Sequence, residues 1–411
     1  MDTGNTAFIL LAAAMVFLMT PGLAFFYGGL GRRKNVINNM MMTIVPIAIA
    51  GILWIICGYS LSFSGTGSFI GNFNHLFLEN VSSTDVGVAS SISDLTFSLF
   101  QMMFSIITIA IVTGSVSGRM RFTPLMIFMG IWLITVYYPL AHMVWGGGLL
   151  AKMGALDFAG GDVVHISSGV SGLVLALVIG KRRDFYHLDY RPHNIPFVLL
   201  GAGMLAFGWF GFNAGSALAA DGTAVHAFMT TIIAGSCAMF SWVVLEKSLV
   251  GKPSLIGAST GLIAGFVAIT PGAGFVPIWS SIIIGLLVSP ICYFAISYLK
   301  PKLSYDDSLD AFGCHGIGGI FGGLMTALFT SPKLTPEEGN FGLLFGSTHL
   351  FGATLFAIFF TIIWSGVLSF VIIKIIGKVM PLRVSEREEA IGLDDSEHEE
   401  TAYPTFMGLD S

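Results

Sequence analysis

The dominant pattern in the chain is a series of long apolar runs separated by short polar segments. A transmembrane helix needs about 20 predominantly apolar residues. Eleven runs approach or exceed that length, near residues 6–30, 38–62, 95–117, 122–141, 160–180, 194–214, 224–245, 254–271, 275–299, 309–330 and 345–377. The pattern predicts an all-α integral membrane protein with eleven transmembrane helices. The last run is the longest, which predicts a strongly tilted helix or one that extends past the bilayer.

Two short stretches on the fifth and tenth runs share one spacing of Asp, His and Gly, which we call the repeated skeleton. In DFAGGDVVHISSGVSG, Asp157 stands eight residues before His165, and Gly follows that His at the fourth and seventh positions. DSLDAFGCHGIGGIFG has the same spacing from Asp307 to His315. Five helices per half is an odd number, so the halves must cross the membrane in opposite senses. The sequence therefore predicts a five-plus-five inverted repeat followed by one extra C-terminal helix, an arrangement common among transporters.

Composition agrees with a membrane protein, because 54% of the residues are hydrophobic and only 10% are charged, against about 25% charged in a soluble domain. Much of the net charge of -5 comes from one end of the chain. The segment 381–411 carries nine acidic residues against Arg383 and Arg387. We therefore divide the chain into a transmembrane domain, 1–380, and an acidic C-terminal tail, 381–411, and expect no nucleic-acid partner.

Basic residues predict the orientation of the chain. With the N-terminus outside, seventeen of the nineteen Lys and Arg residues fall in inner loops and in the tail, leaving only Lys152 and Lys333 on the outer side. This is the distribution that the positive-inside rule describes. It predicts an external N-terminus and a cytoplasmic C-terminus.

The two histidines are the first candidates for chemistry. A His within a membrane span is costly and marks a pathway or relay more often than packing. Two of them at matching places of an inverted repeat favour one shared site at the midplane, rather than two separate interior imidazoles. Neutral imidazoles can hydrogen-bond in series. No third ligand stands at a spacing typical of zinc, and the four Cys residues are scattered singly, so we expect no metal, cofactor or disulfide framework.

Aromatic and polar residues near the outer ends of several runs form a second candidate site. Each could also be packing or part of the interfacial aromatic belt, but together they suggest an outer cup for a cation, since aromatic faces attract ammonium-type groups. Asp157 could cap its helix, stabilise a cation approaching from outside, or do both. The set is Phe100, Phe104, Trp145, Trp209 and Phe212, with the hydroxyl of Ser216.

Several motifs together resemble the ammonium transporter (Amt/MEP/Rh) family, in its bacterial Amt branch. They are HMVWGGGLL, ALDFAGGDVVHI, GWFGFNAGS, GKPSLIGASTG and DAFGCHGIGG. The resemblance implies that His165 and His315 are twin pore histidines and that Phe104 and Phe212 are stacked phenyl gates beside Phe100. It implies an outer ammonium site at Trp145 and Ser216 and a role for Asp157 in deprotonation. Trp209 and Thr270 would line the pore or its outer mouth.

The resemblance also implies a homotrimer in the inner (plasma) membrane, regulated by a PII-type signalling protein at its cytoplasmic face. Two positions depart from the family pattern. Gly118 in Ser117-Gly118-Arg119 stands where the family commonly has Glu, which could alter the inner mouth or the docking of the tail. Asp162 often corresponds to a neutral residue and adds a carboxyl group near the outer start of the fifth helix.

The expected function is the transport of ammonium across the inner membrane, with deprotonation outside and ammonia crossing an apolar, His-lined pore. Two other classes remain open. One is an ammonium sensor that signals through its tail with little flux, although the tail is too short for an output domain. The other is a channel for a small neutral solute, which would gain little from a cation cup. No nucleophile–base pair or cofactor motif indicates an enzyme.

Overall fold

The computed structural model describes residues 1–185, 191–335 and 339–403. Within these ranges there is no β-strand, and eleven helical segments are long and apolar enough to cross a membrane. They are Thr3–Leu30, Arg33–Phe63, Asp94–Val116, Phe122–Lys152, Gly161–Ile179, Ile195–Gly215, Gly222–Leu249, Leu255–Gly272, Ile278–Leu303, Phe312–Phe329 and His349–Val379. The predicted all-α architecture with eleven membrane helices is confirmed. The fourth segment extends well past the predicted end at 141, because α8 continues it after the turn at Trp145.

Several spans are built from two or three helical pieces, whereas α1, α10, α11 and α16 each form a whole span. Their bounds are α1 Thr3–Leu30, α2 Val36–Ile44, α3 Pro46–Leu53, α4 Tyr59–Phe63, α5 Asp94–Val112, α6 Phe122–Trp132, α7 Tyr138–Val144, α8 Leu149–Lys152, α9 Ser167–Ile179, α10 Ile195–Gly215, α11 Gly222–Leu249, α12 Leu255–Ile269, α13 Ile278–Phe294, α14 Lys300–Leu303, α15 Ile317–Phe329, α16 His349–Val379, α17 Glu386–Ile391 and α18 Leu393–His398. Short π-helical turns occupy Trp54–Gly58, Leu133–Tyr137, Gly161–Ile166, Ala295–Leu299 and Phe312–Gly316. Such turns are rare and often mark functional sites.

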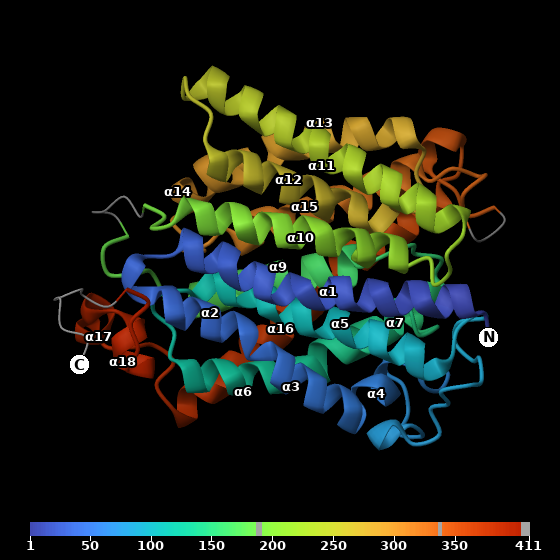
Figure 1. The fold of residues 1–411 in the computed structure, drawn as a ribbon, viewed down its shortest axis with the longest axis horizontal. Helices are drawn as coiled ribbons and strands as arrows, with labels where there is room; N and C mark the ends of the chain where they lie inside the picture. The colour runs from blue at the N-terminus through green and yellow to red at the C-terminus, as the bar shows by residue number, and fades with distance from the viewer. Residues whose placement is uncertain (186–190, 336–338, 404–411) are drawn as a thin grey trace.

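The long helices run side by side along one direction of the molecule (Figure 1). The N-terminus lies at one end of this bundle, and the short helices α17 and α18 of the tail lie at the other (Figure 1). An odd number of crossings places the two ends of a chain on opposite sides. The observed arrangement therefore agrees with the predicted eleven spans.

The two repeated stretches meet at the centre of the bundle. α9 and α15 each have 13 residues, and a π-helical turn that carries the His precedes each of them. A Cβ atom on Gly169 would clash with the backbone of Gly316, and one on Gly319 would lie 3.0 Å from the Cβ of His165. Gly169 and Gly319 therefore each let their helix approach the other copy. This reciprocal contact is what the predicted inverted repeat requires.

The tail beyond α16 is mostly ordered against the end of the bundle. Residues 404–411 of the predicted tail, including Asp410, lie outside the described residues. The membrane part of the fold ends where α16 ends at Val379, so the predicted boundary at 380 falls at a helix terminus.

Candidate functional site

A cavity of about 310 Å³, called the outer cavity below, lies at the end of the bundle that the sequence predicts to be external. Trp145, Phe104, Ser216 and Asp157 all line it, so the residues predicted for the outer site are brought together in space. Trp145 follows α7 directly, and Ser216 follows α10 directly. The Ser216 hydroxyl donates to the carbonyl of Phe212 at 2.8 Å, which leaves its lone pairs available as acceptors. Aromatic faces with a hydroxyl acceptor can hold a small cation that has N–H groups.

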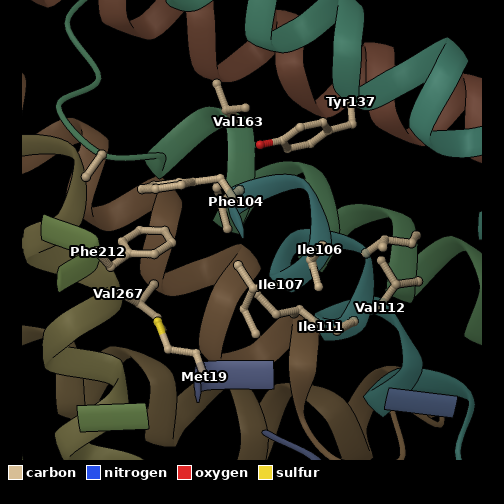
Figure 2. Close-up of a cluster of buried hydrophobic side chains, with 14 of the residues drawn as sticks. Met19, Phe104, Ile106, Ile107, Ile111, Val112, Tyr137, Val163, Phe212 and Val267 are labelled. Atoms are coloured by element: carbon tan, nitrogen blue, oxygen red, sulfur yellow. The ribbon is translucent and has the colours of Figure 1, made fainter. Parts of the chain in front are cut away.

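Two stacked phenyl rings close the inner end of this cavity. The ring centroids of Phe104 and Phe212 lie 4.2 Å apart at 27°, and Figure 2 shows the two rings one over the other within a cluster of apolar side chains. Both residues are 1% exposed. Phe100 meets Phe104 edge-on at 4.9 Å, and Gly215 allows this because a Cβ there would lie 2.8 Å from the Phe100 ring. The pair forms an apolar barrier without a polar group to stabilise a charge.

Beyond the barrier, the two histidines lie in contact. Nδ1 of His165 and Nδ1 of His315 are 3.3 Å apart. One of these nitrogens must carry a hydrogen and the other must accept it, so the neutral rings adopt opposite tautomers with respect to this bond. The His165 ring also stacks on Trp209 at 5.6 Å and on Phe212 at 6.1 Å. Both imidazoles line a second cavity of about 210 Å³ that continues toward the opposite end of the bundle.

Thr270 lies behind the Trp209 indole. It lines neither of these two cavities within the described residues. Its hydroxyl accepts a hydrogen bond from Nε1 of Trp209 at 3.0 Å and lies 3.3 Å from the Asn213 side-chain oxygen. Trp209, by contrast, lines the inner cavity. Thr270 and Asn213 therefore orient the indole, and the sequence singled out only the first of them.

Asp157 caps the turn that carries His165. Its carboxylate accepts backbone N–H bonds from four successive residues, at 2.8, 2.6, 2.8 and 3.3 Å (Gly160, Gly161, Asp162 and Val163). Its carbonyl accepts the indole N–H of Trp145 at 2.8 Å. Burial raises the pKa of Asp157, and the four N–H bonds oppose that effect. The capping role and the place at the wall of the outer cavity coexist, so one residue connects the outer cavity to the His-bearing turn.

The inner end of the bundle holds a buried charge cluster. Arg119 is fully buried and donates to the carbonyl of Gly180 at 2.7 Å and to Ser308. Burial lowers the pKa of Arg119 to about 10. Asp306 forms an ion pair with Arg182 at 2.6 Å. Burial alone would raise the pKa of Asp306, but hydrogen bonds and charge from the two arginines lower it, so both signs stay ionised at neutral pH.

The structure explains why position 118 is a glycine in this chain. Its φ is +80°, in the left-handed region that favours glycine, and a Cβ there would lie 2.8 Å from the Asn35 side-chain nitrogen. Asn35 in turn accepts the backbone N–H of Leu393 in the tail at 2.9 Å. Gly118 therefore lies beside a contact between Asn35 and the tail.

The tail docks on the inner loops through several polar contacts. Arg121 pairs with Glu388 at 2.8 Å and with Glu397 at 3.1 Å. The Asp394 carboxylate accepts two backbone N–H groups at the start of α2. The basic residue that anchors the tail most directly is thus Arg121, which the sequence did not single out because its partners lie more than 260 residues away.

The fold and the cavities define a class: a multi-pass helical membrane protein with two cavities separated by a phenyl barrier, the second of them lined by a histidine pair. The family model described as Ammonium Transporter Family matches residues 7–403. The chain belongs to the ammonium transporter family.

Named relatives are similar to the chain over its whole length. An ammonium transporter of Bacillus subtilis is 45% identical over 99% of this chain and 100% of the relative. Ammonium transporter Amt1 of Archaeoglobus fulgidus is 43% identical, with 98% and 100% covered. The crystal structure of Saccharomyces cerevisiae Mep2 superposes with a TM-score of 0.89 at 34% identity, covering 100% of this chain and 93% of Mep2. A structure titled Sensor Amt Protein has a TM-score of 0.89 at 27% identity, with 96% and 98% covered.

Proposed function

We propose that the chain transports ammonium across the inner (plasma) membrane by moving ammonia through the pore between its two cavities. The observation that carries this proposal is the alignment of the outer cup, the Phe104–Phe212 barrier and the His165–His315 pair. Ammonium is recruited at Trp145, Phe104 and Ser216. It loses a proton in the neighbourhood of Asp157, and the neutral molecule passes the barrier.

Deprotonation explains how such a pore selects its substrate. Ammonium and potassium have similar size and the same charge, so an aromatic cup separates them poorly. A charge at the bilayer centre costs about 2.5–3.5 kcal/mol or more on insertion scales, whereas a neutral molecule avoids that cost. Only ammonium can release a proton and become neutral. The apolar barrier between Phe104 and Phe212 then rejects potassium.

The test is current measurement on proteoliposomes with ammonium pulses and matched potassium pulses, combined with a pH dye inside the vesicles. Transport predicts an ammonium current, internal alkalinisation on an ammonium gradient, or both, without a potassium current. Silence in both assays, with ammonium binding intact, would refute transport. That result would favour a sensor, the second candidate, which the likeness to the structure titled Sensor Amt Protein supports.

We also propose how the chain sits in the membrane, how it assembles and what regulates it. The lipid bilayer covers the exposed apolar side chains of the outer helices, such as Phe240 and Phe359. The basic residues favour an external N-terminus and a cytoplasmic tail, and the family resemblance favours a homotrimer. The docked tail presents an acidic surface at the inner end of the bundle, where a PII-type regulator would bind. Deleting residues 385–411 tests this part: unchanged regulator binding and unchanged transport would refute it.

A further inference from the structure

His142 is a buried imidazole that the pore itself does not use. It lies in the last turn of α7, shortly before Trp145, and is 0% exposed. Its Nδ1 lies 3.0 Å from the backbone carbonyl oxygen of Ser62, and its Nε2 lies 2.8 Å from that of Gly67. The residue lines neither the outer nor the inner cavity. A role for His142 must therefore act through the groups that its ring holds.

The two carbonyl partners require that the ring of His142 donates twice. A carbonyl oxygen only accepts hydrogen bonds, so each ring nitrogen must carry a hydrogen. A neutral imidazole has a single N–H and would turn a lone pair toward one of the two carbonyl oxygens. Only the imidazolium satisfies both contacts, and both hydrogen bonds are then charge-assisted. The last turn of a helix is also a favourable place for a positive charge, because the helix dipole has its negative end there.

Further contacts join the same two parts of the chain. The segment 62–68 includes the end of α4, and α4 and α7 lie toward the same end of the bundle as the N-terminus (Figure 1). The Ser68 carbonyl accepts the backbone N–H of Leu149 at 2.7 Å. The Thr66 carbonyl accepts a hydrogen bond from the Lys152 ammonium at 3.2 Å. The carbonyl groups of segment 62–68 are thus held by donors from α7, from α8 and from the turn between them.

Glycines in the turn after α7 make this close contact possible. A Cβ atom on Gly146 would lie 2.2 Å from the Ser62 carbonyl oxygen and 2.7 Å from Nδ1 of His142. The backbone carbonyl of His142 accepts the N–H groups of Gly146 and Gly148, each at 3.0 Å. His142 therefore holds the turn through its backbone and segment 62–68 through its ring.

Both of these parts contribute aromatic walls to the outer cavity. Phe63, which follows Ser62, and Trp145, in the turn after α7, both line that cavity. The indole N–H of Trp145 is held from the other side by the Asp157 carbonyl, at 2.8 Å. The ring of His142 therefore fixes the position of the Phe63 wall relative to the Trp145 wall.

We propose that His142, with a hydrogen on both ring nitrogens, is a positioning residue for the recruitment of ammonium. The inference rests on the proposed function and deepens it at the outer site. The ring does not touch the substrate. It ties segment 62–68 to the turn that carries Trp145, so the aromatic walls keep the spacing at which their faces attract a small cation. Because the walls are ordered in advance, ammonium binds without the cost of ordering them.

The main test measures ammonium-evoked current against ammonium concentration in proteoliposomes containing the full chain. His142→Gln keeps a polar side chain but donates from a single nitrogen, so it cannot hold both carbonyl groups as the imidazolium does. We expect the half-saturating ammonium concentration to rise about tenfold or more, the effect of losing one hydrogen bond from a charged group. The maximal current should stay within about twofold of the wild type, because only binding is weakened. An unchanged half-saturating concentration would overturn the inference, as would a loss confined to the maximal current.

His75→Gln is the matched control. His75 follows segment 62–68 in the same loop, and its Nδ1 lies 3.0 Å from one backbone carbonyl oxygen, that of Glu79. A neutral ring satisfies a single carbonyl partner, and His75 lines neither cavity. Both the half-saturating concentration and the maximal current should therefore match the wild type. A rise as large as that in His142→Gln would overturn the inference, because the double contact of His142 would then have no special effect.

A measurement on the wild-type protein keeps the inference testable should His142→Gln fail to fold. Solid-state NMR on protein with isotope-labelled histidine rings and labelled Ser and Gly carbonyl carbons identifies His142 as the ring whose two nitrogens lie near a Ser and a Gly carbonyl. We expect a hydrogen on each of these nitrogens at the pH of the current assay. A ring with a single N–H would overturn the inference. Silence of the wild-type protein in the transport assays would instead refute the proposed function and the role in recruitment, whereas the NMR result would still decide the protonation of the ring.

Discussion

The outer and inner copies of the repeated stretch have similar backbone structures but differ in their polar side chains. Asp157 in the outer copy accepts four backbone N–H bonds. Asp307 in the inner copy accepts two, at 2.8 and 3.4 Å, and its Oδ1 has no partner within the described residues. The histidine-bearing turns and the helices that follow them nevertheless have almost the same lengths. The two copies therefore place their imidazoles in similar ways, although the hydrogen bonds of the neighbouring aspartates differ.

The residues between Asp and His make the two halves unequal. Position 162 of the outer copy corresponds in spacing to Phe312 of the inner copy, so a carboxyl group is replaced by an aromatic ring. The outer copy faces the aromatic cup, whereas near the inner copy Asp310 is neutralised by Lys300. In the mechanism proposed above, this inequality lets one end recruit a cation and the other release a neutral molecule.

The largest effect should come from making the centre of the pore acidic. His165→Asp combined with His315→Asp replaces two neutral rings, whose Nδ1 atoms are 3.3 Å apart, by carboxyl groups. Because the barrier to a cation there is about 2.5–3.5 kcal/mol or more, we expect the ratio of potassium to ammonium current to rise about 100-fold. Paired ion pulses on proteoliposomes measure this ratio. Selectivity that survives unchanged would contradict the apolar-filter mechanism.

The second test separates the two capping aspartates. Asp157→Asn leaves one oxygen for four N–H groups, and a hydrogen bond to a charged group contributes about 1.5–3 kcal/mol. We expect ammonium current to fall about 100-fold in this variant and about tenfold or less in Asp307→Asn. Equal losses would mean that both copies depend on their caps to the same degree, and the comparison between them would fail.

The third test concerns the glycines that let the two copies meet. A Cβ on Gly169 would clash with backbone atoms of Gly316, whereas one on Gly319 would lie 3.0 Å from a side-chain atom of His165. Backbone yields less than a side chain, so Gly169→Ala should destabilise the protein by about 2–3 kcal/mol and Gly319→Ala by about 1 kcal/mol. Thermal unfolding in detergent gives the order. A larger loss in Gly319→Ala would contradict the packing described above.

The smallest effect concerns the tail, which has no counterpart at the outer end. Hydrogen bonds from Ser385, and then Arg121, lower the pKa of Glu388 below its ordinary value of 4.5. Because the pKa of Glu388 is lower in the docked tail than in the free tail, ionised Glu388 stabilises docking above pH 4.5. This stabilisation is lost as the pH falls through the pKa of the docked state. Limited proteolysis of the tail should therefore accelerate below about pH 4.5, and Glu388→Gln should remove much of this pH dependence.

Glu386→Gln is the control for the tail. Glu386 belongs to the same short helix but forms none of the ion pairs found in the described part of the chain. Its variant should retain the wild-type pH dependence of proteolysis. Identical profiles for the Glu388 and Glu386 variants would show that the Arg121 contact does not hold the tail.

Hydropathy and spacing determined much of this protein before any contact was known. Apolar runs of sufficient length must form helices in a bilayer, because unpaired backbone groups are too costly there. The spacing of Asp157 and His165, repeated in Asp307 and His315, placed the histidines in the two copies and predicted their meeting. These properties are local or periodic, so a linear sequence carries them directly.

Only the tertiary structure decided which polar groups meet between distant helices. The sequence did not show that Arg119 is buried against Gly180 and Ser308, because these partners lie 61 and 189 residues later. Likewise, the structure shows that Thr270 accepts a hydrogen bond from the Trp209 indole and that Arg121 pairs with Glu388 of the tail. A hydrogen bond depends on distance and direction between two side chains, and no periodicity in one segment records where its partner lies.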